Sequence, residues 1–204
     1  MLDVKTITDL HRETVERWHR QSFDADIPSD FLTLVREQHR RNYDLWHEED
    51  IARSPDVSDV EIARVKRSID RLNQERNDHI EKLDAAIIEM LAQDGLPPHS
   101  HAPMNTETPG SAIDRLSIMS LRIYHMDEQV QRNNVSAEHR QKAAQRLSRC
   151  LEQHRDLSLA LEQLLGDLFE GRKILKVYHQ FKMYNDPTLN PYLYKRNSGV
   201  ETGR

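Results

Sequence analysis

One short stretch of the chain gathers side chains of several chemical kinds at helical spacing. Trp46, His47, Glu49, Asp50 and Arg53 follow one another closely. Positions 46, 49, 50 and 53 fall on one face of a helix, because side chains three or four residues apart lie one above the other. Imidazole and carboxylate groups are common proton donors and acceptors in enzymes. We therefore expect His47, Glu49 and Asp50 as catalytic candidates, with Trp46 and Arg53 as ligand-binding neighbours.

Residues 58–93 carry polar groups next to a face that must be buried. The apolar residues of this segment recur every three or four positions, as in the core-facing stripe of a helix, and Arg76 stands within that stripe. A second line at the same spacing contains Asp70, Asn73 and Asn77. Asn and Asp are poor helix formers, so a merely solvated face would favour Glu, Lys, Arg and Gln. These short side chains predict hydrogen bonds across a helix interface or to a ligand.

A further helical segment, over residues 109–132, has apolar residues on all sides and is expected near the centre of the molecule. Asp114, Arg115 and His125 nevertheless belong to it. Positions 114 and 125 share one stripe of the helix with the apolar positions 118 and 121. The segment therefore adds an acid, a guanidinium group and an imidazole to the polar residues of the other two helices.

These polar groups admit two interpretations. Buried charges are costly unless they are paired, so the first interpretation is a set of internal salt bridges in which Asp70, Asp114 or Glu49 pairs with Arg76 and Arg115. The other interpretation is a ligand-binding or catalytic site, because the polar groups outnumber what pairing alone requires. Both interpretations stay open at the level of the sequence.

Near the C-terminus, residues 172–196 carry a net positive charge, whereas the net charge of the whole chain is negative. Lysines and arginines, Lys182 among them, alternate with tyrosines such as Tyr184, and Asp186 is the acid that accompanies them. Basic and aromatic groups together suit a phosphate and a stacked base or sugar. The pattern is also typical of an arm whose tyrosines pack on the bundle while its lysines stay in water.

Composition excludes several classes of protein. The 204 residues carry a net charge of -5, which argues against indiscriminate nucleic-acid binding. The single cysteine, Cys150, excludes an internal disulfide and fits a reducing cytoplasm. The chain shows no apolar run long enough for membrane insertion and no apolar signal segment at its start. We expect a cytoplasmic protein without nucleic-acid partners.

No metal site is predicted. The paired Glu-x-x-His motifs of di-iron helical bundles are missing. Most of the histidines, including His11, His19 and His79, are assigned to unrelated helix faces. The sequence specifies no cofactor.

The distribution of Gly and Pro predicts the architecture. We expect helices over residues 5–21, 30–53, 58–93, 109–132 and 136–171, with a mobile proline-rich connector at 95–109. One more helical piece and several turns should follow, and residues 197–204 should form a flexible tail after a single domain at 1–196. Short connections between long helices favour antiparallel neighbours. The predicted fold is all-α, an up-down antiparallel bundle of four main long helices with a short N-terminal helix and an irregular C-terminal arm.

Four strings of the chain resemble a bacterial family, the domain of unknown function family 4254. They are NYDLWHEEDIAR, IDRLNQERNDHIEKLD, TPGSAIDRLSIMSLRIYHM and YHQFKMYNDPTLNPYLY, which lie between residues 42 and 194. The family brings no established activity. The resemblance implies a context near glycosyltransferases for envelope glycans, and it emphasises the following residues: Trp46, His47, Glu49, Asp50, Arg53, Asp70, Asn73, Arg76, Asn77, Asp78, Pro109, Gly110, Ser111, Asp114, Arg115, His125, Lys182, Tyr184, Asn185 and Asp186.

The leading hypothesis is a cytoplasmic protein that binds or acts on an anionic phosphorylated or nucleotide-sugar molecule. Arg76, Arg115 and Lys182 would clamp the anion, and Asn73 and Asn77 would orient its polar groups. The alternative is a non-enzymatic accessory protein, forming a homodimer or docking on a glycosyltransferase. In that case the internal polar groups only fix the register of the helices.

Overall fold

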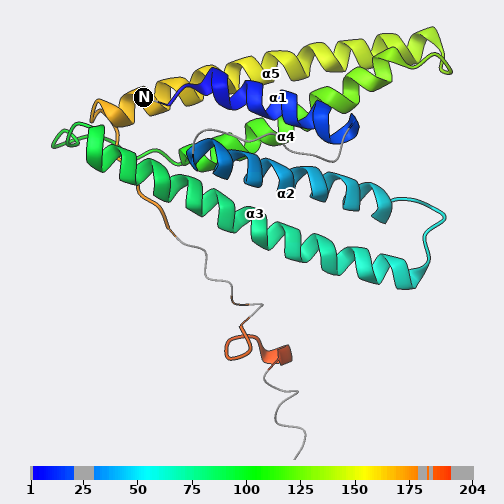
Figure 1. Ribbon diagram of the computed structural model, residues 1–204, viewed down its shortest axis with the longest axis horizontal. Coiled ribbons are helices and arrows are strands. Elements are labelled where there is room, and N and C mark those ends of the chain that lie inside the picture. The colour runs from blue at the N-terminus through cyan, green and yellow to red at the C-terminus, as the bar shows by residue number, and fades with distance from the viewer. Residues whose placement is uncertain (1, 21–29, 179–182, 184–185, 194–204) are drawn as a thin grey trace, which may run out of the picture.

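The computed structural model describes residues 2–20, 30–178, 183 and 186–193. In this part of the chain the protein is all-α, as predicted, and its long helices pack against one another (Figure 1). They are α1 (Val4–Arg20), α2 (Asp30–Ala52), α3 (Asp59–Asp94), α4 (Pro109–Gln131) and α5 (Ala137–Phe169). None of the described helices has the length and apolar character that a bilayer span requires.

Side-chain caps explain where three of the helices begin. Ser58, Thr108 and Ser136 each accept a hydrogen bond from the backbone N–H three residues further on. Such caps satisfy N–H groups that the first turn of a helix leaves without partners. The predicted starts of α3, α4 and α5 are therefore confirmed.

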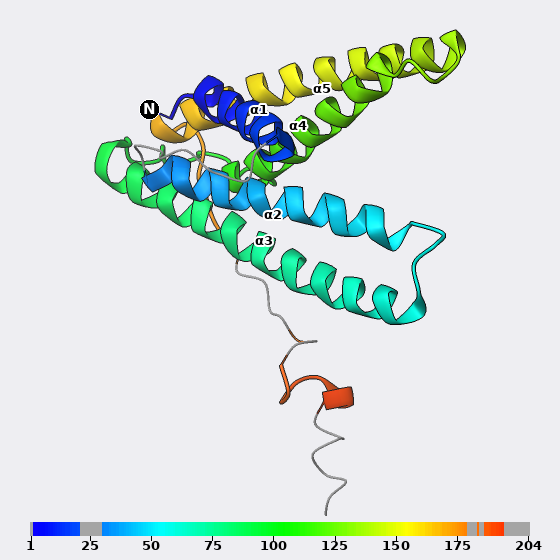
Figure 2. The same cartoon turned by 45° about the vertical axis from the view of Figure 1, so that its right-hand side comes forward.

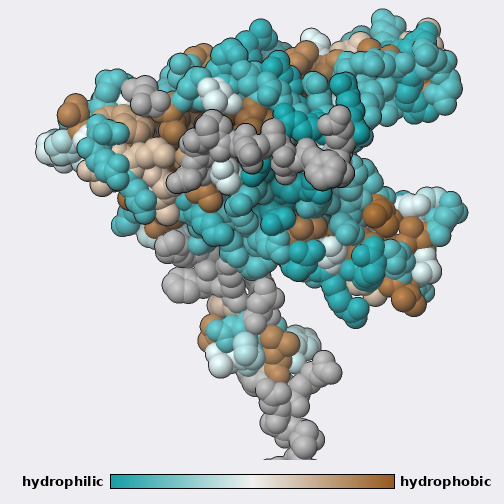
Figure 3. Space-filling model, in the orientation of Figure 1, coloured by the Kyte–Doolittle hydropathy of each residue, from teal (hydrophilic) through white to brown (hydrophobic). Residues whose placement is uncertain are grey.

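Two helical hairpins make up most of the molecule. α2 packs along α3 and α4 packs along α5, while α1 lies against α4 and α2. Figures 1 and 2 show that the two hairpins diverge toward their turns, at residues 53–58 and 132–136. Figure 3 shows the surface hollowed between these two ends. The bundle is therefore closed at one end and forked at the other.

The apolar core is divided by a polar layer. The main cluster, at the closed end, consists of Val4, Ile7, Phe31, Val35, Leu83, Ile87, Ala112, Ile113, Leu116, Leu161 and Leu165. A smaller cluster between α2 and α3 consists of Leu45, Val65, Ile69 and Leu72. Along α2, the buried polar residues Gln38, His39 and Asn42 separate Val35 from Leu45. Polar groups thus lie inside the bundle, as the sequence predicts.

The proline-rich connector differs from the mobile segment that its composition suggests. Leu96 N–H donates to the Phe169 carbonyl and His99 N–H to the Gly171 carbonyl, both at 2.9 Å. Gly171 has a φ of +69°, and a Cβ at this position would meet the Pro97 carbonyl oxygen at 2.5 Å. The connector is therefore fastened to the end of α5. The predicted tail, residues 197–204, lies outside the described residues.

The backbone of α3 leaves no space for a side chain at Gly110, at the start of α4, so a larger residue there should destabilise the protein. Its N–H donates to Asp84 Oδ1 at 2.7 Å, and an added Cβ would meet the Ile80 carbonyl oxygen at 2.7 Å. We expect Gly110→Ala to lower the free energy of unfolding by about 1–3 kcal/mol, measured by urea denaturation, because backbone atoms must shift.

Gly166→Ala in α5 is the matched control. The nearest atom to its added Cβ is 4.0 Å away. Because Ala has a higher helix propensity than Gly, the free energy of unfolding of this variant should be unchanged or higher by up to about 1 kcal/mol. Equal stability of the two variants would contradict the close approach of α3 and α4.

Candidate functional site

The carboxylate of Asp114 lies at the centre of the polar layer. Its Oδ1 accepts hydrogen bonds from Gln38 Nε2 at 2.6 Å, Asn42 Nδ2 at 2.9 Å and Arg76 Nε at 2.7 Å. A second guanidinium nitrogen of Arg76 donates to Oδ2, which makes the pair bidentate. Asp114 is 3% exposed. This one carboxylate therefore ties α4 to both α2 and α3.

The network continues toward α1 through neutral groups. Asn42 also donates to Ser117 Oγ at 2.8 Å. His39 Nε2 donates to the His11 carbonyl at 3.1 Å, so its Nδ1 accepts from Ser117 Oγ at 2.6 Å. Burial lowers the pKa of His39 to about 3, against an ordinary 6.5. His39 is therefore a neutral hydrogen-bonding group at pH 7.

A cleft opens beside this network, where α2, α3 and α4 meet. Its volume is about 370 Å³. Trp46, Glu49 and Asp50 of α2 and Arg53, directly after its end, line the cleft together with polar groups of α3 and apolar groups of α4. Arg53 Nη1 donates to Glu49 Oε2 at 2.5 Å, but the Arg53 side chain is 70% exposed. Such exposed pairs are weak and can exchange one partner for a ligand.

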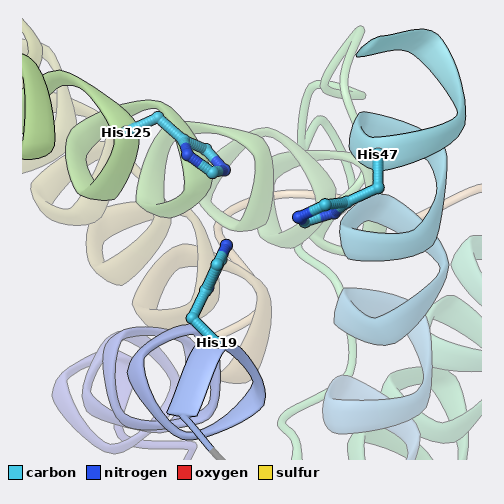
Figure 4. A group of neighbouring side chains, drawn as sticks. All are labelled: His19, His47 and His125. Atoms are coloured by element: carbon cyan, nitrogen blue, oxygen red, sulfur yellow. The ribbon is translucent and has the colours of Figure 1, made fainter. Parts of the chain in front are cut away.

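Three histidines converge next to the cleft. His19 of α1, His47 of α2 and His125 of α4 each place a ring nitrogen within 4.8 Å of the others. Figure 4 shows the tips of the three rings pointing toward one another. The rings of Trp46 and His125 stack at 4.9 Å between centroids. Since Trp46 also lines the cleft, the three-histidine cluster and the cleft share a wall.

The structure brings many of the predicted site residues together. Those that line the cleft are Trp46, Glu49, Asp50, Arg53, Asn73 and Arg76. Asp114 lies behind Arg76 as its hydrogen-bonded partner. His47 and His125 belong to the three-histidine cluster.

Other predicted residues do not join this group. Asp70 is exposed and pairs with Lys66 of its own helix. Arg115 is exposed and pairs with Glu107 at 2.8 Å, and Asn77 is half-buried outside the cleft lining. Residues 182 and 184, predicted as Lys182 and Tyr184 of the ligand site, lie outside the described residues. Within the described part, the expected clamp of several cations is therefore not assembled, because Arg76 and Arg115 lie on different faces with acids of their own.

Three members of the site were not identified from the sequence: His19, His39 and Ser117. One signal for His19 was present. α1 buries Val4, Ile7, His11, Val15 and Trp18 at helical spacing, and position 19 follows Val15 by one turn, at the edge of this inward face. The assignment of His19 to an unrelated helix face is therefore wrong, because its ring joins those of His47 and His125.

A family model described as "Protein of unknown function (DUF4254)" matches residues 32–177. The chain belongs to this family. No curated protein and no solved structure matches it. The DUF4254 match spans most of α2 and all of α3, α4 and α5, and so contains the cleft, whereas His19 of α1 precedes it.

The buried pair predicts a large loss of stability when the carboxylate is removed. Asp114→Ala leaves Arg76, Gln38 and Asn42 without their shared acceptor. We expect the free energy of unfolding to fall by about 3–5 kcal/mol in chemical denaturation. Asp70→Ala removes the acid of an exposed pair and should change it by less than about 0.5 kcal/mol. Similar effects for both would show that Asp114 is not the centre of the network.

The neutral state of His39 predicts a dependence of stability on pH. The unfolded chain takes up a proton near pH 6.5, whereas folded His39 takes one up only near 3. Stability is therefore fully present above pH 6.5 and is lost as the pH falls toward 3. Between pH 7 and 5, His39 should account for about 2 kcal/mol of lost unfolding free energy.

His39→Gln should reduce this pH-dependent loss when urea unfolding is compared at the two pH values. The exposed His139 provides the control, because His139→Gln removes a histidine that is not buried. An unchanged pH dependence in His39→Gln would contradict the burial of a neutral imidazole.

Proposed function

We propose that this protein binds a small phosphorylated sugar, of the nucleotide-sugar class, in the cleft between α2, α3 and α4. The observation that supports this function is the set of groups around one space of about 370 Å³: an indole, two amides, two carboxylates and two guanidinium groups. Ligand pockets of this size combine apolar walls with a few polar groups that fix orientation.

The polar groups of the cleft suit hydroxyl groups better than a bare anion. Glu49 and Asp50 accept hydrogen bonds, and the amide of Asn73 both donates and accepts. Arg53 is the cation for the phosphate, because its exposed pair with Glu49 exchanges easily, while Arg76 is held by Asp114. A proton transferred at this site would involve Glu49 or Asp50.

The setting is proposed from the sequence. A chain with one cysteine suits a reducing cytoplasm. The resemblance of its strings to a family near glycosyltransferases favours envelope-glycan metabolism, where sugars are handled as phosphate esters. We therefore propose a cytoplasmic role in that metabolism.

One observation favours a second candidate function. The carboxylate of Asp114 finds its donors on α2 and α3, and Arg76 already has an internal partner. A protein whose polar layer only fixes helix register would act as an accessory, with a second copy of the chain or a glycosyltransferase as its partner.

Ligand-dependent stabilisation separates the two candidates. The protein is screened by thermal shift with nucleotide sugars and sugar phosphates, and hits are titrated by calorimetry. Arg53→Gln should weaken binding by about 10–100-fold, since hydrogen bonds to charged groups contribute about 1.5–3 kcal/mol. The exposed location of Arg53 leaves folding intact.

Arg64→Gln is the matched control, because Arg64 pairs with Glu61 on the surface of α3 but does not line the cleft. It should leave affinity unchanged. If no sugar phosphate stabilises the protein, or both Arg variants bind equally well, the cleft is not the binding site and the accessory role is favoured.

A further inference from the structure

We propose that His19, His47 and His125 form a binding site for one divalent transition-metal ion of the zinc class. The three side chains come from separate helices, α1, α2 and α4, yet their ring nitrogens lie within 4.8 Å of one another (Figure 4). Sequence proximity therefore does not explain the cluster. It exists only because the three helices dock.

The hydrogen bonds of the rings determine which nitrogens are free to bind. Nδ1 of His19 and Nδ1 of His47 face the backbone carbonyls of Val15 and Tyr43, both at 2.8 Å. A carbonyl only accepts, so each Nδ1 carries the proton and each Nε2 presents its lone pair. Metal-binding histidines are typically held in this way, with the second ring nitrogen donating to a carbonyl or carboxylate.

His125 follows the same pattern with a carboxylate as its support. Its Nδ1 donates to Glu128 Oε2 at 2.9 Å. In many metal sites a carboxylate accepts a hydrogen bond from one ring nitrogen of a histidine while the other nitrogen binds the metal. The carboxylate makes the histidine a stronger ligand, and Glu128 is placed to do this for His125. All three imidazoles are thus fixed in the tautomer that metal binding requires.

Two of the three lone pairs have no hydrogen-bond donor in the described part of the chain. Nε2 of His19 and Nε2 of His125 are buried and without a hydrogen-bond partner among the described residues. A buried acceptor left unsatisfied costs about 1–3 kcal/mol. Packing of aromatic rings around the cluster accounts for the burial of His19, which stacks on Tyr124 at 4.2 Å. Packing does not explain why these unprotonated ring nitrogens point toward one another.

The donor set selects the class of ion. Three imidazoles suit zinc and its neighbours, whereas Mg²⁺ and Ca²⁺ require oxygen ligands. A tetrahedral Zn²⁺ with bonds of about 2.0–2.1 Å holds its nitrogens about 3.3 Å apart, so small side-chain rotations must draw the rings together. Three protein ligands leave a coordination position for water or for a bound molecule. The shared wall at Trp46 places this position near the cleft.

The test uses Zn²⁺ alone, with no sugar phosphate, so that its outcome is independent of the proposed ligand. The full chain is treated with a chelator, dialysed and titrated with Zn²⁺ by calorimetry, and Co²⁺ binding is followed by visible absorption. We expect one ion per chain and the strong visible bands of four-coordinate Co²⁺, with no competition from Mg²⁺. Replacing any of the three histidines by Gln should weaken binding by more than about 100-fold.

Two further variants keep the test decisive. His79→Gln is the control, because His79 Nδ1 also faces a carbonyl, that of Glu75, but the residue lies outside the cluster. Glu128→Gln changes a half-exposed support, should fold normally, and should weaken Zn²⁺ binding by about 10–100-fold. The proposal is overturned if the wild type does not bind Zn²⁺, or if the cluster variants and His79→Gln bind it equally well.

The two proposals can fail separately. If Arg53→Gln no longer binds the sugar phosphate but still binds Zn²⁺, both sites exist and they are distinct. Zn²⁺ binding without any sugar-phosphate binding would remove the proposed function and leave the metal site in place.

Discussion

The arrangement of this protein depends on one buried carboxylate. Asp114 of α4 would be expensive to bury alone, and it is accommodated because Gln38 and Asn42 of α2 and Arg76 of α3 all donate to it. Hydrogen bonds of this kind require a fixed distance and direction, unlike apolar contacts, which tolerate sliding. The register of three helices is therefore determined at this point rather than by the apolar core alone.

That constraint also determines where a ligand can enter. On one side of the polar layer, the main apolar cluster fills the space between the helices. On the other side, the two hairpins diverge and packing is incomplete, so polar side chains of α2, α3 and α4 meet solvent in the cleft. The cleft and the three-histidine cluster both lie at this transition. Their side chains are held by packed helices but remain open on one side, which is the situation that a rigid binding site requires.

The sequence predicted the parts of this arrangement that follow from local chemistry. Capping residues located the starts of the helices, and Arg76 inside an apolar stripe revealed the polar interior. Spacing on α2 placed Trp46 and Arg53 on the face that lines the cleft. The direction of Arg115 could not be read in the same way, because a helix that is apolar on all sides does not reveal which face its neighbours cover. The choice of Asp114 as the acid for Arg76 likewise depends on tertiary packing, since Asp70 and Glu49 were equally plausible in the sequence.

The three-histidine cluster shows a more general limit of sequence reasoning. Each histidine taken alone is an ordinary helix residue with its Nδ1 bonded to a nearby acceptor, and no spacing within one helix relates His19 to His47 or His125. Their relation arises only when α1 docks on α2 and α4. A ligand that needs all three nitrogens would bind the docked state and not the undocked one, so its binding energy would add to the packing of α1. α1 also precedes the segment that the DUF4254 model matches, so the completeness of such a site depends on a helix outside the match.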